Sequence, residues 1–144
     1  MPRQIIRLAP PARWALFWTL FNGIGALCGA LMMWIAPSSF GMTPLLESIQ
    51  QNLPLIGRFF TSFALPGVCL LVIIGVPHLV SAVLVMRHHR HAPTAVIISG
   101  VILILWILLQ LLAVFGPNPT SFAWLVFGVV ETALAIWWIL GRRR

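Results

Sequence analysis

The chain alternates between four long apolar runs and shorter connections that carry most of its polar residues. The runs cover about residues 14–36, 60–86, 94–115 and 121–140. Each run, folded as an α-helix with a rise of about 1.5 Å per residue, is long enough to cross the ~30 Å hydrocarbon layer of a bilayer. The pattern therefore predicts an all-α membrane protein, a four-transmembrane-helix bundle in which residues 1–144 form a single domain.

The connection between the first two runs, residues 37–59, is the only long one and has a helical pattern of its own. Thr43 is placed to cap a helix that has Pro44 at its first position. Apolar residues then recur on one face and polar residues on the other: Leu45, Leu46, Ile49 and Leu53 against Glu47, Ser48, Gln50, Gln51 and Asn52. We expect a short amphipathic helix on the outer membrane surface, which either covers the end of the bundle or acts as a lid over an outward-facing cavity.

Small residues and prolines interrupt the first two runs. Gly25 and Gly29 form a small-xxx-small pair in the first run, a face that could admit another helix closely. In the second run Pro77 has no N–H and disrupts the helical bond to the carbonyl of Ile73. A kink at Pro77 is expected.

The amino-acid composition indicates that the chain is surrounded mostly by lipid and excludes nucleic acid as a partner. Of the 144 residues, 60% are hydrophobic and 8% are charged, so polar side chains are too few to cover a soluble globule. The net charge of +7 comes from arginines that flank the apolar runs. In that position they contact anionic headgroups, so we expect membrane lipids as partners and no nucleic acid.

The arginines also orient the bundle. Eight of the nine fall on one side of the membrane when the runs are threaded through it: Arg3, Arg7, Arg13, Arg87, Arg90, Arg142, Arg143 and Arg144. Only Arg58 falls on the opposite side. The positive-inside rule therefore predicts cytoplasmic N and C termini, with residues 37–59 outside.

Polar residues inside the runs are the candidate functional residues. Glu131 is the one carboxylate within a run, about 15 Å from the inner end of the fourth helix. Asn22 and His78 reach a depth of about 12–14 Å, so the three can share one layer. An ionised carboxylate at this depth costs several kcal/mol unless it is paired. We expect Glu131 to be protonated or to face polar partners, in a layer that binds a polar ligand, relays a proton or holds the helices together.

Three further polar residues lie closer to the outer side. Gln110 is about 24 Å from the inner end, a depth similar to that of Cys28 and Cys69. A second polar layer, with Gln110 as a further ligand-binding candidate, is one interpretation. The two cysteines lack a C-x-x-C spacing, and we expect them to pack as small apolar residues.

The sequence offers little support for catalysis or for a bound metal or cofactor. The histidine-rich turn contains His88, His89 and His91 and has no Cys, Asp or Glu beside it. This composition favours a solvated basic turn over a metal site. A four-helix haem protein usually needs two intramembrane histidines, and His78 is the only one within a run. We expect no catalytic residues, metal or cofactor.

The order of features resembles a group of small bacterial four-helix membrane proteins of unknown function, DoxX-like in outline. The resemblance spans about residues 20 to 140 and is carried by the long outer loop and four loose motifs: Leu65-Pro66-Gly67, Arg87-His-His-Arg90, Trp106-Ile-Leu-Leu-Gln110 and Gly128-Val-Val-Glu131. It implies a multi-pass protein of the bacterial inner (cell) membrane and transfers no catalytic residues.

Two functions fit these observations. The first is a non-enzymatic membrane protein that binds a lipid or small apolar ligand, or acts as a component of a larger membrane assembly. The alternative is a small proton-coupled transporter that uses Glu131 and His78. A transporter of this size would need to form a homo-oligomer to enclose a path.

Overall fold

The computed structural model describes residues 9–36, 43–59, 61–113 and 119–142, and this part of the chain is helical and contains no strand. The elements in chain order are α1 (Pro10–Ile35), α2 (Thr43–Asn52), α3 (Pro54–Gly57), α4 (Ala64–Leu70), η2 (Leu71–Gly75), α5 (Val76–Met86), α6 (Ala92–Ala113) and α7 (Pro119–Arg142). Four stretches are long and apolar enough to cross a membrane: Pro10–Ile35, Ala64–Met86, Ala92–Leu112 and Pro119–Gly141. The predicted all-α four-helix membrane bundle is confirmed.

The helices begin and end somewhat away from the expected limits. The first helix begins at Pro10, before Trp14, and the fourth begins at Pro119, before Ser121. Proline suits the first turn of a helix, where its missing N–H leaves no bond unmade. The second begins at Ala64, later than expected, and Phe60 lies outside the described residues. Apolar runs mark the hydrocarbon-facing part of each helix, whereas the helices themselves end where backbone and capping geometry allow.

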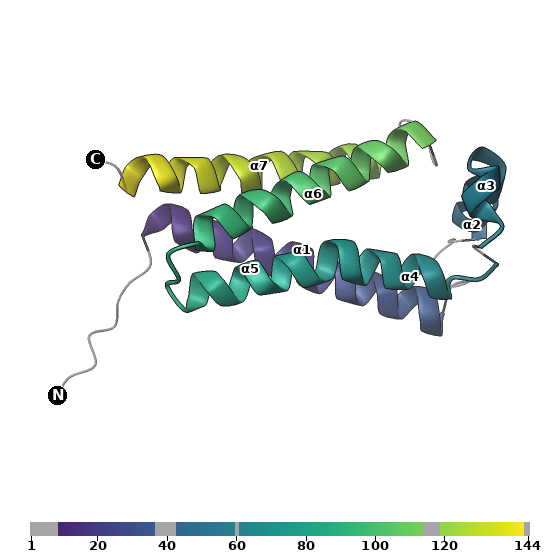
Figure 1. Cartoon of the computed structure of the whole chain (residues 1–144), viewed down its shortest axis with the longest axis horizontal. Coiled ribbons are helices and arrows are strands. Elements are labelled where there is room, and N and C mark those ends of the chain that lie inside the picture. The colour runs from purple at the N-terminus through teal and green to yellow at the C-terminus, as the bar shows by residue number, and fades with distance from the viewer. Residues whose placement is uncertain (1–8, 37–42, 60, 114–118, 143–144) are drawn as a thin grey trace.

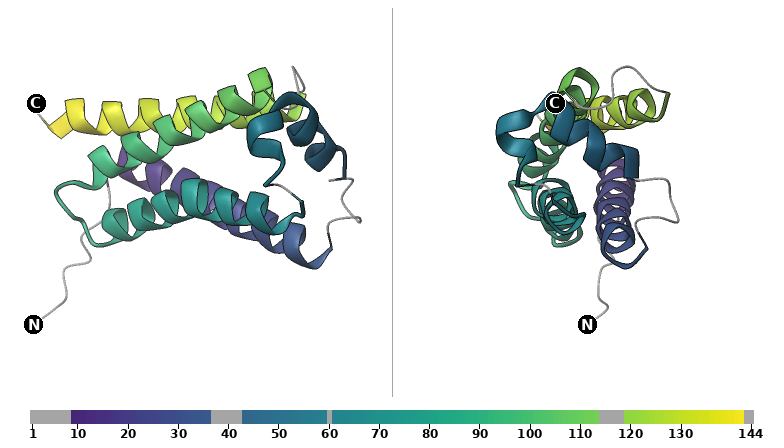
Figure 2. Two further views of the ribbon diagram at one scale, coloured as in Figure 1. Left: turned by 45° about the vertical axis from the view of Figure 1, so that its right-hand side comes forward. Right: turned by 90° about the vertical axis from the view of Figure 1, so that its right-hand side faces the viewer.

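The spanning helices form two antiparallel pairs that meet at one end. In Figure 1, α1 lies beside α4 and α5, and α6 lies beside α7. The two pairs are in contact through α5 with α6 and through α1 with α7. We call this junction the basic end, because it carries the exposed residues Arg13, Arg87 and Arg90. From there the two pairs diverge toward α2 and α3, so the bundle has the form of a V (Figures 1 and 2).

Two apolar clusters pack between the spanning stretches, with polar residues between them. The cluster near the basic end is rich in alanine and joins all four spans: Ala12, Ala15, Val85, Ala92, Val96, Ala135 and Trp138. The second cluster contains Ala26, Ile74, Leu103 and Ile107. Small side chains in the first cluster let the helix backbones approach one another. Larger residues in the second cluster accompany the divergence of the pairs.

Glycines set the close contact between α6 and α7. A Cβ atom added to Gly100 would collide with Thr132 Oγ1 and would lie 3.2 Å from the Gly128 carbonyl oxygen. One added to Gly128 would lie 2.9 Å from Ile104 Cγ1. The Thr132 hydroxyl donates to the Gly128 carbonyl at 2.8 Å, so it is satisfied within its own helix. The two backbones can therefore pack at a distance that no larger residue would permit.

The second span contains a π-helical turn. Directly before Pro77, where the sequence predicts a kink, the backbone N–H of Val76 donates to the Leu71 carbonyl five residues back in η2. Regular α-helix resumes at Val76. Such wide turns occur mostly as single insertions, frequently at functional sites. This one places His78 immediately after it, facing the centre of the bundle.

The small-residue face of α1 packs within the chain. A Cβ on Gly29 would lie 3.0 Å from Leu70 in the second span, and one on Gly25 would lie 3.4 Å from Trp124 in α7. The helices that this face admits are thus α4 and α7 of the same molecule.

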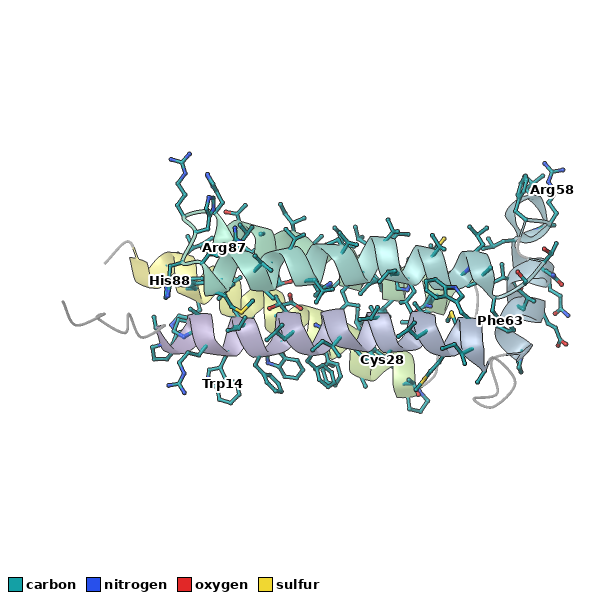
Figure 3. All side chains as sticks on the ribbon, turned by 90° about the horizontal axis from the view of Figure 1, so that it is seen from below. Trp14, Cys28, Arg58, Phe63, Arg87 and His88 are labelled. Carbon is teal, nitrogen blue, oxygen red and sulfur yellow. The ribbon has the colours of Figure 1, made fainter. Side chains whose placement is uncertain are left out.

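The outer connection contains the expected helix. In α2, Ile49 is buried whereas Glu47 and Gln50 are exposed, which agrees with the predicted amphipathic pattern. The α2 and α3 helices stand across the open end of the V (Figure 2). Arg58 follows them, at the opposite end of the bundle from Arg87 and His88 (Figure 3).

Candidate functional site

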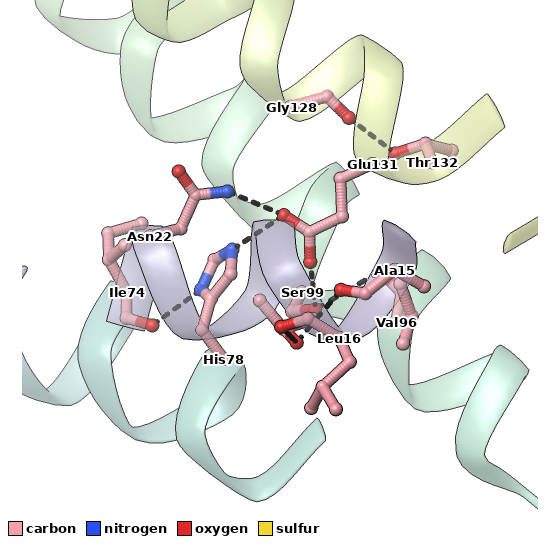
Figure 4. A network of polar contacts seen from close by, with 11 residues as sticks. Ala15, Leu16, Asn22, Ile74, His78, Val96, Ser99, Gly128, Glu131 and Thr132 are labelled. Atoms are coloured by element: carbon pink, nitrogen blue, oxygen red, sulfur yellow. Dashed lines mark hydrogen bonds and ion pairs between the residues drawn. The ribbon is translucent and has the colours of Figure 1, made fainter. Parts of the chain in front are cut away.

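A polar layer crosses the bundle with one side chain from each spanning stretch. The Glu131 carboxyl from α7 is at its centre and is fully buried. Asn22 from α1 donates through Nδ2 to Glu131 Oε2 at 2.6 Å. The Ser99 hydroxyl from α6 is 3.1 Å from Oε1, and His78 Nε2 from the second span is 3.3 Å from Oε2 (Figure 4). All three partners are also buried, so the carboxyl meets protein groups on every side.

The backbone decides which His78 nitrogen carries a hydrogen. Nδ1 is 2.6 Å from the Ile74 carbonyl oxygen. A carbonyl oxygen can only accept, so Nδ1 is the donor, and Nε2 is the atom that faces Glu131. The 3.3 Å contact between Nε2 and Oε2 has the distance of an ion pair but not the alignment of a hydrogen bond.

One proton between His78 and Glu131 would satisfy both groups. Two bare lone pairs at this distance would repel each other, and a net charge on the buried pair would be costly. A single proton, on Nε2 as an ion pair or on Oε2 as a neutral pair, would remove both penalties. The pair would then have no net charge.

Ser99 has one hydroxyl hydrogen and two acceptors. Its Oγ lies 3.0 Å from the Val96 carbonyl oxygen and 3.1 Å from Glu131 Oε1. When the hydrogen points to Val96, the Oγ lone pairs are free to accept a hydrogen from Oε1. The single hydroxyl hydrogen can therefore bond to the Val96 carbonyl or to the Glu131 carboxyl, but not fully to both at once.

Only one of the two polar atoms of the Asn22 side chain has a hydrogen-bond partner among the described residues. Its Nδ2 donates to Glu131, but its Oδ1 is buried and has no hydrogen-bond partner among the described residues. Neighbouring Thr19 does not supply one, because its hydroxyl is directed to the carbonyls of Ala15 and Leu16 in its own helix. A buried amide oxygen without a partner is uncommon and calls for an explanation.

A cavity begins at Asn22 and extends away from the basic end. Its volume is about 280 Å³, and it lies between the two arms of the V, with residues of α1, the second span, α6 and α7 around it. The walls are mostly apolar: Gly25, Ala26, Gly29, Met33, Leu70, Ile74, Leu103, Trp106, Ile107 and Trp124, with Asn22 and Gln110 as the polar members. A largely apolar cavity with a few polar groups is the ordinary form of a small-molecule site.

The predicted site residues thus separate into two positions. Asn22, His78 and Glu131 come together in one layer, as their depths suggested, while Gln110 lies apart from them on the cavity wall. Their roles in binding or proton transfer remain predictions. Cys28 is exposed and Cys69 is half-buried; both are free thiols, and neither lines the cavity with Gln110.

Sequence reasoning did not select Ser99 as a site residue. The available signal was a lone hydroxyl within an Ile- and Leu-rich run, next to Gly100. Serine is common in membrane helices, where it often bonds to its own backbone. The second bond to Glu131 depends on how closely α6 approaches α7, which sequence spacing does not reveal.

The histidine-rich turn stays apart from this layer. His88, His89 and His91 are exposed at the basic end, and His91 Nε2 accepts from Arg90 Nε at 2.8 Å. Within the described ranges, no group of three or more His, Cys, Asp or Glu side chains is placed to hold a metal ion.

Comparison of the chain with protein-family models, curated proteins and solved structures finds no match. The resemblance to DoxX-like proteins therefore remains an expectation, and function has to be argued from the site itself.

Proposed function

We propose that this multi-pass membrane protein binds a small, largely apolar ligand in the cavity between the arms of its V. In this proposal it is non-enzymatic, resides in a bacterial inner membrane with both termini in the cytoplasm, and presents the cavity toward the outer side. A role within a larger membrane assembly is compatible with ligand binding.

The cavity is the observation that supports this proposal. Its volume of about 280 Å³ is close to the lower end of the range for small-molecule pockets, about 300–1,000 Å³. A space of this size loses dispersion contacts along its lining unless something fills it. A ligand with an apolar body would restore those contacts.

Photolabelling tests the proposal directly. The protein in lipid nanodiscs is exposed to an alkyl diazirine, and labelled peptides are mapped by mass spectrometry. We expect labelling of the α6 cavity wall, around Leu103 and Ile107. Gly25→Leu should reduce it about tenfold, since a side chain there enters the cavity and removes about 1.4 kcal/mol or more of ligand burial.

Cys28→Leu is the matched control. Cys28 lies on the same helix as Gly25 but is exposed and does not line the cavity, so this variant should be labelled like the wild type. Equal labelling of the α6 wall in the Gly25→Leu variant and the wild type would contradict the proposal. So would labelling confined to side chains on the outer surface of the bundle.

A second candidate, proton-coupled transport, is favoured by the contact between His78 and Glu131. A buried pair that can share one proton, beside a hydroxyl that can reorient, is suited to proton uptake and release. The test is substrate flux into proteoliposomes under a pH gradient. Transport requires flux that Glu131→Gln abolishes; flux unaffected by that variant would exclude this role for Glu131.

A further inference from the structure

Asn22, one of the residues around the cavity, has a buried acceptor without a donor among the described residues. Asn22 is 1% exposed and lines the cavity, and its Oδ1 has no hydrogen-bond partner within the described part of the chain. In Figure 4 this oxygen points away from the carboxyl of Glu131, while the amide nitrogen points toward it. A buried carbonyl left in this state costs about 1–3 kcal/mol.

The orientation of the amide follows from its neighbours. Asn22 Nδ2 donates to Glu131 Oε2 at 2.6 Å, so the amide nitrogen faces the carboxyl. With an ionised carboxylate, the reversed amide would place two bare oxygens against each other at this distance. The Asn22 oxygen is therefore on the side of the amide away from the carboxyl (Figure 4), and Asn22 is one of the residues around the cavity.

We propose that the ligand carries a neutral hydrogen-bond donor, a hydroxyl group, at the end of its apolar body, and that this hydroxyl donates to Asn22 Oδ1. The inference rests on the proposed function and specifies the class of ligand: an apolar alcohol. The hydroxyl satisfies the amide oxygen, and the hydrocarbon part contacts the apolar walls.

Charge argues for a neutral donor over an ammonium group. Of the described residues that line the cavity, none is charged. Glu131 lies behind Asn22, and its carboxyl is already in contact with Asn22, Ser99 and His78. An unbalanced ammonium group in this apolar space would lose far more hydration than one hydrogen bond returns.

The first test compares two ligands on the wild-type protein. A long-chain alcohol and its methyl ether compete with the alkyl diazirine for the wild-type protein in nanodiscs, both at the same mole fraction in the membrane. The ether keeps the oxygen and the chain but has no hydrogen to donate. We expect the alcohol to displace the probe about tenfold more effectively than the ether, because the ether leaves Oδ1 unpaired.

Two variants locate the hydroxyl. Gln110→Leu removes the other polar side chain of the cavity wall and should keep the preference for the alcohol. Asn22→Leu should abolish it. The comparison of alcohol with ether in the wild type does not depend on whether Asn22→Leu folds.

The outcomes separate this inference from the proposed function. Equal displacement by alcohol and ether in the wild type overturns the inference but leaves apolar ligand binding intact; a water molecule that satisfies Oδ1 would give this result. Loss of the preference in Gln110→Leu also overturns it, since the hydroxyl would then lie on the opposite wall. Failure of all the competitors and of the probe itself to reach the cavity would refute the proposed function.

Discussion

Glu131 is the residue at which polar side chains from the other three spans meet. It accepts from Asn22, contacts His78 and bonds to Ser99, so each of three other spans presents a polar atom to it. Interhelical hydrogen bonds in membranes are individually modest, about 0.6 kcal/mol on average. Their joint effect here is to fix the rotation of each helix about its own axis.

Glutamine at position 131 should preserve this layer but reverse the orientation of the Asn22 side-chain amide. His78 Nε2 is an acceptor when Nδ1 donates to Ile74, so the new amide would place its NH2 group where Oε2 lies and donate to both Nε2 and Asn22 Oδ1. Nδ2 of Asn22 would then lie where Oδ1 lies in the wild type. We expect Glu131→Gln to bind the methyl ether about tenfold better than the wild type does, by the competition assay.

Leucine is the contrasting substitution. Glu131→Leu leaves Asn22, His78 and Ser99 without their common partner and should lower the stability by about 2 kcal/mol, measured by unfolding in mixed micelles. Glu131→Gln should stay close to the wild type. Equal stability of the Leu and Gln variants would mean that the layer contributes no net stabilisation.

Depth counting along the sequence was enough to predict that Asn22, His78 and Glu131 share a layer. That reasoning works because the rise of a helix is constant. It says nothing of rotation about the helix axis, so the choice of Ser99 and the free oxygen of Asn22 could not be predicted. Gln110 shows the same limit, since its depth was known but the wall on which it lies was not.

At the scale of elements, the α6–α7 contact should tolerate little change. Gly100→Ala should destabilise the protein by about 1–3 kcal/mol, because the added methyl group meets Thr132 Oγ1 and the backbone of Gly128. Gly25→Ala is the control, since its methyl group makes only ordinary contact with Trp124. Thermal unfolding of both variants compares them. A Gly100→Ala variant as stable as Gly25→Ala would contradict the packing described here.

The helices were predictable as elements, but their interruption was not. Hydrophobic run lengths revealed four spans, and the pattern around Ile49 revealed α2. Pro77 signalled a disturbance of the second span, yet the sequence could not distinguish a kink from the π-helical turn that precedes it. The missing N–H of Pro77 shows where the helical bonding must change, but not how many residues the changed turn contains.

At the scale of the whole molecule, the basic end sets the expected orientation. Arg87 lies there, at the opposite end of the bundle from Arg58 (Figure 3), while Arg13 is in the first turn of α1 and Arg90 is in the turn between α5 and α6. We expect a reporter that is active only in the cytoplasm to be active when fused after Arg144 and inactive when inserted near Gln50. The opposite pattern would reverse the topology and turn the cavity toward the cytoplasm.

The even number of spans has a further consequence. Because α1 begins and α7 ends at the same end of the bundle, two copies can be encoded as one polypeptide with a flexible linker and no added helix (Figure 1). Glu131→Gln can then be placed in one half of such a tandem chain while the other half stays intact. The activity of a chain with one intact copy and one variant copy then shows whether neighbouring copies act together.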